Sequence, residues 1–93
     1  MTLTMDYTGQ LASVTGVAEE QVEVGEGECL LDVLKARLAV HGEKFGELLF
    51  DDEGGIRSTL LVVLDGEQAT GDKASVSLSG VKVVMLMTPI AGG

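Results

Sequence analysis

The feature that most constrains the fold of this chain is an apolar run near its C-terminal end, Val81–Met87, which is interrupted only by Lys82. The run is far shorter than the ~20 apolar residues of a membrane span, and its length and composition are typical of a strand. A strand without polar alternation has much of both faces covered, so we expect it near the centre of a sheet. Pro89 cannot donate to a ladder and marks where the pairing stops.

Shorter strand patterns precede this run. Residues 2–7 and 21–24 each alternate apolar and polar side chains, which is the period of a half-buried strand, and the two segments could pair as a hairpin. The apolar run Leu60–Leu64 ends at Asp65-Gly66, a strong turn signal, and residues 75–78 could add another short strand. The sequence therefore predicts a sheet of four to five strands.

One amphipathic helix is predicted from Cys29 to His41. Its apolar residues recur at three- and four-residue spacings and form a single face: Leu30, Leu31, Leu34, Leu38 and His41. Glu26 and Glu28 lie near its N-terminus, where acidic side chains favour the helix dipole, and Gly42 is placed to end it. The helix is expected to pack this face against the sheet.

Two segments are expected to lack long regular elements. Residues 8–16 are predicted to form a turn or a short helical loop, and residues 46–57 a loop with the acidic run Asp51-Asp52-Glu53 and the turn Gly54-Gly55. One main helix packed on a mixed sheet of four to five strands is an α+β architecture. The order of the strands does not follow from this pattern.

Composition bounds the function. The 93 residues suffice for one domain, and fifteen acidic against six basic residues give a net charge of −9. This charge argues against a nucleic-acid binder and against attraction to an anionic membrane surface. It suits a partner with a basic groove, although the acidic residues could equally serve to keep a small protein soluble.

The remaining reactive side chains predict no catalytic or metal site. Cys29 is the single cysteine, so there is no internal disulfide and no cysteine metal cluster, and we expect a structural thiol. His41 has no second ligand at metal spacing, and residues 51–55 lack the pattern of a calcium loop. Nothing at the N-terminus has the form of a signal peptide, so the protein is expected to be cytoplasmic.

The last two residues, Gly92-Gly93, suggest that the terminal carboxylate is the working group. A tail without side chains can enter a channel too narrow for other residues, and its carbonyl is open to attack once it is activated. The alternative is an ordinary frayed end. The diglycine alone does not decide between the two.

Taken together, these segments resemble the MoaD/ThiS sulfur carriers, which are small ubiquitin-like β-grasp proteins. The resemblance covers a first strand leading into 7–16, one helix after a glycine break, the strand and turn at 61–67, and a last strand that runs into Pro89–Gly93. Two features depart from the family: Gly80-Val81 stands where relatives often have Gly-Asp, and a single proline precedes the tail.

The resemblance implies a β-grasp domain over residues 1–88 and a flexible tail over residues 89–93. It implies that an ATP-dependent activating enzyme adenylates Gly93, that sulfur from a persulfide then gives a thiocarboxylate, and that Ala91 and Gly92 keep the tail slender. A sulfur-acceptor enzyme, such as a large synthase subunit, would use this sulfur in cofactor or metabolite biosynthesis, for example of molybdopterin or thiamin. The chain itself would be no enzyme and would bind no cofactor.

Two alternatives remain open from the residues. The activated Gly93 could instead be attacked by a lysine amine, which would make the chain a ubiquitin-like modifier. The tail could also be chemically idle, in which case the domain would be an adaptor that binds a partner through its sheet.

The outward face of the last strand is expected to help dock both partners. Two alternating sets of side chains could form it: Val83, Met85 and Met87, or Lys82, Val84 and Leu86. The preference of Lys82 for solvent favours the second set, whereas alignment with relatives back from the diglycine favours the first, which we adopt. The predicted partner-binding residues are Met85, Met87, Pro89 and Ile90, because the flexible methionine thioether suits a face with more than one partner. The alternative is that both methionines belong to the core.

Overall fold

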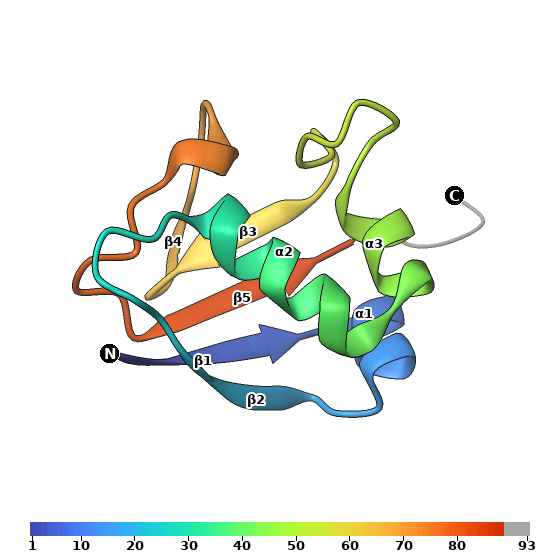
Figure 1. Ribbon diagram of the computed structural model, residues 1–93, viewed down its shortest axis with the longest axis horizontal. Helices are drawn as coiled ribbons and strands as arrows, with labels where there is room; N and C mark the ends of the chain where they lie inside the picture. The colour runs from blue at the N-terminus through green and yellow to red at the C-terminus, as the bar shows by residue number, and fades with distance from the viewer. Residues whose placement is uncertain (89–93) are drawn as a thin grey trace.

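A computed structural model of the protein describes residues 1–88, which carry five strands, three α-helices and one 3₁₀ turn (Figure 1). In chain order these elements are β1 (Thr2–Tyr7), α1 (Gly9–Thr15), β2 (Glu19–Glu23), α2 (Leu30–His41), α3 (Glu43–Leu49), β3 (Leu61–Leu64), β4 (Glu67–Gln68), η1 (Lys73–Ser75) and β5 (Val83–Met87). The described residues therefore form an α+β architecture.

The five strands form one mixed sheet in the order β2-β1-β5-β3-β4. β1 and β5 are parallel, and the other neighbours are antiparallel. The prediction that the last apolar run forms a central strand is confirmed, as is the predicted hairpin between β1 and β2. Because β5 has a paired neighbour on each side, its backbone position is fixed from both edges.

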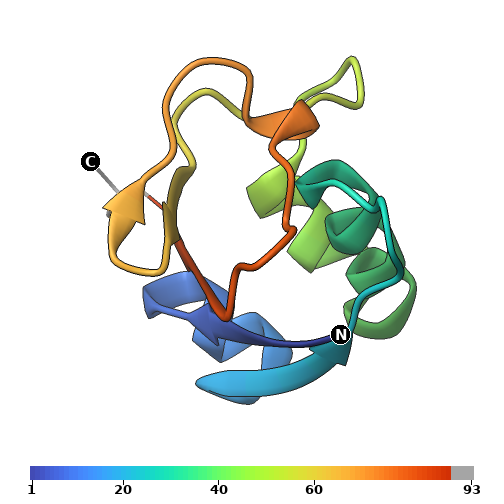
Figure 2. The ribbon, with the colours of Figure 1, turned by 90° about the vertical axis from the view of Figure 1, so that its left-hand side faces the viewer.

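The hydrophobic core lies between one face of this sheet and the helices. Figure 2 shows α2 and α3 on one side of the curved sheet. The buried side chains come from alternate strand positions and from the inner faces of the helices, and they include Leu3, Met5, Leu30, Leu34, Phe45, Leu49, Val62, Val84 and Leu86. The core is almost wholly aliphatic, and no polar or charged residue among those described is buried.

The predicted helix is confirmed as α2, with Cys29 at its N-cap. Asp32 completes a capping box, since its carboxylate accepts from the Cys29 N–H at 3.1 Å and from the Cys29 thiol at 3.2 Å. The helix ends as expected at Gly42, whose φ of 90° is the left-handed region that glycine adopts without strain. The Gly42 N–H bonds back to the Leu38 carbonyl at 2.9 Å.

Two predictions are wrong in part. The predicted loop 46–57 begins inside α3, a short helix that forms because Phe45 and Leu49, one turn apart, are both buried in the core. Gly46 lies between them because a Cβ there would be 2.6 Å from the Leu38 Cδ1 atom. Residues 75–78 form no strand; they contain the end of η1 and a single bridge between Ser77 and Cys29, so their alternation reflects isolated burial rather than a ladder.

A polar cluster ties β2 to β1 and α2. The Glu20 carboxylate accepts a hydrogen bond from the Tyr7 hydroxyl, lies 2.8 Å from Nε2 of His41 and forms an ion pair with Arg37 at 3.5 Å. Burial and the neighbouring carboxylate raise the pKa of Tyr7 well above its ordinary value. Burial alone would raise the pKa of Glu20. The hydrogen bonds from His41 and Tyr7 and the charges of His41 and Arg37 outweigh this effect, so the net result is a lowered pKa.

Candidate functional site

The two faces of β5 are clearly separated. Val84 and Leu86 are fully buried beneath the helices, whereas Val83, Met85 and Met87 lie on the opposite face of the sheet. The set chosen from the resemblance is therefore the exposed one. The preference of Lys82 for solvent does not show which set of β5 side chains is exposed, because Lys82 precedes the strand and is exposed at its end.

Strand β3 extends this exposed face. Leu61 pairs with Met87 and Val63 with Met85, so these side chains share one side of the sheet. We call the five residues Leu61, Val63, Val83, Met85 and Met87 the open apolar patch. Leu61 is 41% exposed and Val83 37%, and together with the half-buried Val63, Met85 and Met87 they form a contiguous apolar surface that is suited to a partner.

Sequence reasoning missed Leu61 and Val63. The run Leu60–Leu64 is apolar throughout, so its pattern does not say which residues point outward. The register with β5 supplies the missing information.

The open apolar patch has an acidic neighbour on the side of β1 and β2. Asp6 pairs with Met85, and Thr4 pairs with Val83, so these polar side chains lie directly beside the patch. Glu19 and Gln21 of β2 pair in turn with Asp6 and Thr4 and continue the polar half of the face. A partner that covers both halves needs an apolar centre and a basic flank.

The start of β5 is held by Asp65, which follows β3. The Asp65 carboxylate accepts hydrogen bonds from the backbone N–H of Val83 at 2.8 Å and of Lys82 at 3.1 Å. Asp65 has a φ of 48° and Gly66 a φ of 89°, which are the left-handed conformations that a tight hairpin turn requires. This turn therefore fixes where the outward alternation of β5 begins.

The other predicted site residues have the following places. Met85 and Met87 lie together on the open face. Pro89, Ile90, Ala91, Gly92 and Gly93 lie outside the described residues. Cys29 and His41 are engaged in the α2 cap and the Glu20 cluster, and the Asp51 carboxylate accepts from the N–H groups of Glu53 and Gly55 within its own turn.

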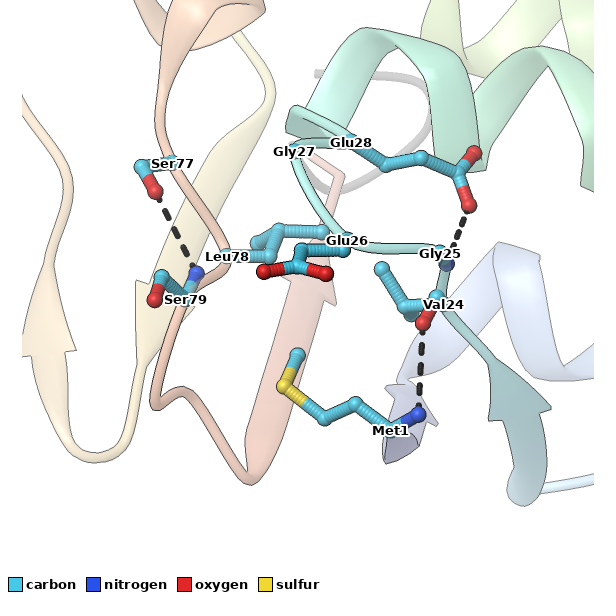
Figure 3. A pocket seen from close by; sticks show the side chains of 9 residues that line it. All are labelled: Met1, Val24, Gly25, Glu26, Gly27, Glu28, Ser77, Leu78 and Ser79. Carbon is cyan, nitrogen blue, oxygen red and sulfur yellow. Dashed lines mark hydrogen bonds between the residues drawn. The ribbon is translucent and has the colours of Figure 1, made fainter.

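A separate hollow of about 320 Å³ lies at the end of the sheet where β1 and β5 begin (Figure 3). It is bordered by Met1, by residues 24–28 and by residues 77–79, and the Glu26 carboxylate points into it. Because β1 and β5 are parallel, Met1 lies toward the start of β5, whereas the tail follows its end. This hollow is therefore not part of the open apolar patch.

Among residues 1–88, no three histidine, cysteine, aspartate or glutamate side chains come together in a way that could hold a metal ion. Within these residues no helix has the length and apolar character needed to cross a membrane.

Comparison with known proteins identifies the fold. No protein-family model and no curated protein matches the chain. It is similar to the crystal structure of SAMP1 from Haloferax volcanii, at 24% identity and a TM-score of 0.81, with 100% of both chains covered. It is also similar to the solution structure of small archaeal modifier protein 1 from Methanosarcina acetivorans, at 16% identity and a TM-score of 0.73, over 99% of this chain and 96% of the other.

A third similar structure belongs to a protein from Pyrococcus furiosus that carries the provisional name molybdopterin converting factor, subunit 1. The identity is 24% and the TM-score 0.68, over 97% of this chain and 99% of the other. The shared architecture is a mixed sheet of five strands packed on one main helix. The chain has the ubiquitin-like β-grasp fold.

Proposed function

We propose that this chain is a sulfur carrier that works through the carboxylate of Gly93. The observation that carries the proposal is the placement of β5, which is held between β1 and β3, presents an apolar outer face and leads directly into residues 89–93. A tail that follows the central strand has a rigid base, so a partner that grips the open apolar patch also positions the tail.

The chemistry requires activation because a carboxylate has no good leaving group. An activating enzyme would join the Gly93 carboxylate to the α-phosphate of ATP, releasing pyrophosphate and leaving AMP as the leaving group. The terminal sulfur of a persulfide on the partner would then displace AMP to form an acyl disulfide, and a second thiol of the partner would attack the persulfide's inner sulfur, releasing the thiocarboxylate and leaving a disulfide on the partner. The chain contributes the acyl group and the docking surface, and the partner contributes ATP binding and catalysis.

The open apolar patch would serve both the activating enzyme and the sulfur-acceptor enzyme. Each must reach the same terminal glycine, so both approach the molecule from the end of β5. Met85 and Met87 have flexible side chains that can adapt to two differently shaped surfaces. The two enzymes would therefore bind in turn rather than together.

Conjugation to lysines is the second candidate function. It is favoured by the similarity to proteins that are named small archaeal modifier proteins. Both functions pass through the same activated glycine, and they differ only in whether sulfur or a lysine amine attacks it.

The test is the intact mass of the protein recovered from its native cells under conditions that do not hydrolyse thioacids. A carrier gains the mass difference between one sulfur and one oxygen atom, located on a peptide that ends at Gly93. A modifier instead appears as a Gly93 remnant on lysines of other proteins. If co-production with the activating enzyme leaves the mass unchanged, the proposal fails and the adaptor alternative stands.

Two variants complete the test. Deletion of Gly92-Gly93 should abolish transfer while the far-ultraviolet circular dichroism and the melting temperature stay the same, because the tail lies beyond β5. Replacement of Gly93 by tryptophan should have the same effect, since the side chain would block a narrow channel. Undiminished transfer by either variant would contradict a role for the terminal carboxylate.

A further inference from the structure

The β2 strand leaves a regular row of backbone groups on the outer edge of the sheet. Val24 and Met1 exchange two backbone hydrogen bonds, and the Tyr7 N–H donates to the Ala18 carbonyl. Hydrogen-bonded and non-hydrogen-bonded pairs alternate along an antiparallel ladder. The residues that bond to β1 are therefore every second one between Ala18 and Val24, which are the even-numbered residues. The N–H and C=O groups of Glu19, Gln21 and Glu23 therefore point away from the sheet.

Nothing in residues 1–88 pairs with this edge, because β2 is the first strand in the sheet order and its only strand partner is β1. The ladder with β1 is regular over Glu19–Glu23, with neither a proline nor a bulge in its register. Proteins usually interrupt such edges, since they can accept another strand. The opposite edge, β4, has only two residues and offers no comparable row.

The helical period of α2 places an exposed valine on the side of the helix that faces β2. Arg37 and His41 of α2 reach Glu20 of β2, whereas Leu34 and Leu38 face the core and α3. Successive residues of an α-helix are rotated by about 100°, so Val40 lies on the side of α2 opposite Leu38. Because Leu38 faces α3, Val40 lies on the side of α2 that is nearer β2. Val40 is 60% exposed, more than the other large apolar side chains that stand out on the surface.

The charges of β2 decide what could pair with it. Glu19 and Glu23 are exposed on the open face of the strand, where Glu23 accepts from the Thr2 hydroxyl and pairs with the Met1 ammonium group at 3.5 Å, whereas Glu20 is engaged by Arg37 and His41. A second copy of this chain would bring a second set of glutamates beside the first, and each copy has a net charge of −9. Like charges placed across a strand pair are destabilising, so self-pairing is disfavoured.

We infer that the β2 edge is a second docking site, which accepts an extended basic segment of a partner protein as an added strand. Lysine or arginine side chains at alternate positions would lie beside Glu19 and Glu23. The apolar side chains between them would lie against Val40. Main-chain hydrogen bonds to Glu19, Gln21 and Glu23 would supply affinity, and the two side-chain rows would supply specificity.

This site is separate from the one proposed for sulfur transfer. β1 lies between β2 and β5, and the backbone row of β2 points away from the open apolar patch. A partner at the edge therefore leaves the open apolar patch uncovered, although its side chains beside Glu19 and Gln21 would border the polar half of the same face. The inference rests on the strand register, the charges of β2 and the exposure of Val40, so it does not depend on the chemistry of Gly93.

The test is a titration of the ¹⁵N-labelled full chain with a short, end-blocked peptide of alternating valine and lysine. The amides of Glu19, Gln21 and Glu23 should shift most, and their hydrogen exchange should slow on saturation, because new hydrogen bonds protect them. A matching peptide of alternating valine and glutamate should not bind. Shifts centred on Val83 and Met85, or equal binding of both peptides, would overturn the inference.

Substitutions at the edge sharpen the result. Gln21→Pro removes an N–H that faces away from β1, so the fold should survive while the peptide binds about tenfold more weakly than to Gln21→Ser. If the proline variant does not fold, the doubly substituted chain Glu19→Lys/Glu23→Lys decides the matter, since it should prefer the glutamate peptide. Unchanged affinity in a folded proline variant, or unchanged peptide preference in the doubly substituted chain, would refute docking at this edge.

Discussion

Replacement of Glu20 by alanine is expected to be the most informative single change in the fold. The Glu20 carboxylate is the shared partner of Tyr7, His41 and Arg37, which come from β1 and α2. Its removal leaves the Tyr7 hydroxyl without an acceptor in a residue that is only 2% exposed. The variant thus tests whether a polar cluster at the rim of an aliphatic core stabilises the position of β2.

The expected cost follows from these contacts. An unpaired buried hydroxyl costs about 1–3 kcal/mol. The contacts with His41 and Arg37 are partly exposed to solvent and add at most about 1 kcal/mol each. The free energy of unfolding should therefore fall by about 1–5 kcal/mol, which corresponds to a decrease in Tm of roughly 4–40 °C for a domain of this size.

Urea unfolding followed by circular dichroism would measure this cost. Glu19→Ala is the matched control, because Glu19 lies next to Glu20 on the same strand but is exposed, and its effect should stay within about 0.5 kcal/mol. A double-mutant cycle with Tyr7→Phe isolates the hydroxyl contact, and the two changes should cost less together than the sum of their separate effects. Equal stabilities of the Glu19 and Glu20 variants, or strict additivity in the cycle, would refute the reasoning.

Four further outcomes are expected. Because the pKa of Glu20 is lowered from 4.5, its carboxylate stabilises the fold above that pH, and the stability advantage of the unsubstituted chain over Glu20→Gln should shrink in urea titrations as the pH falls through the lower, folded-state pKa. Asp65→Ala should lower the free energy of unfolding by about 1–3 kcal/mol, because it removes the acceptor of two backbone N–H groups and alanine adopts the left-handed conformation less readily than aspartate, whereas Asp65→Asn should cost less; equal losses would contradict the role of the Asp65 side chain in holding β5. Met85→Glu should keep the melting temperature but weaken binding to the activating enzyme in calorimetry, whereas Val84→Asp should unfold the domain. Cys29→Ser should retain or slightly raise stability in thermal melts, because serine is a better N-cap residue, and a large loss would show that the thiol packs rather than caps.

The sequence predicts the elements that have a strong period of their own. Alternation identifies β1 and β2, the heptad-like stripe identifies α2, and the apolar run before Pro89 identifies β5 as a central strand. Helix α3 escapes prediction because it is short, contains Gly46 and contributes only Phe45 and Leu49 to the core. Its stability comes from tertiary contacts, including the edge-to-face packing of Phe45 on Tyr7 at 5.9 Å.

The site is predicted only in part, for a physical reason. A strand that is apolar on both faces does not show from its own sequence which side chains point outward, so Met85 and Met87 were assigned through the resemblance. Leu61 and Val63 became part of the patch only through their register with β5. The β2 edge likewise depends on strand order, which periodicity does not determine.

The place of β5 has a consequence for how the protein is made. Among the described residues, the β1–β2 hairpin and the β3–β4 hairpin share no ladder with each other, and within the sheet only β5 joins them. On the ribosome, β5 is synthesised after both hairpins, so the sheet cannot close until translation has passed Met87. A chain that stops earlier exposes two unjoined hairpins with an apolar face, which chaperones and proteases recognise. Only chains that have been translated past β5 can therefore close the sheet and fold.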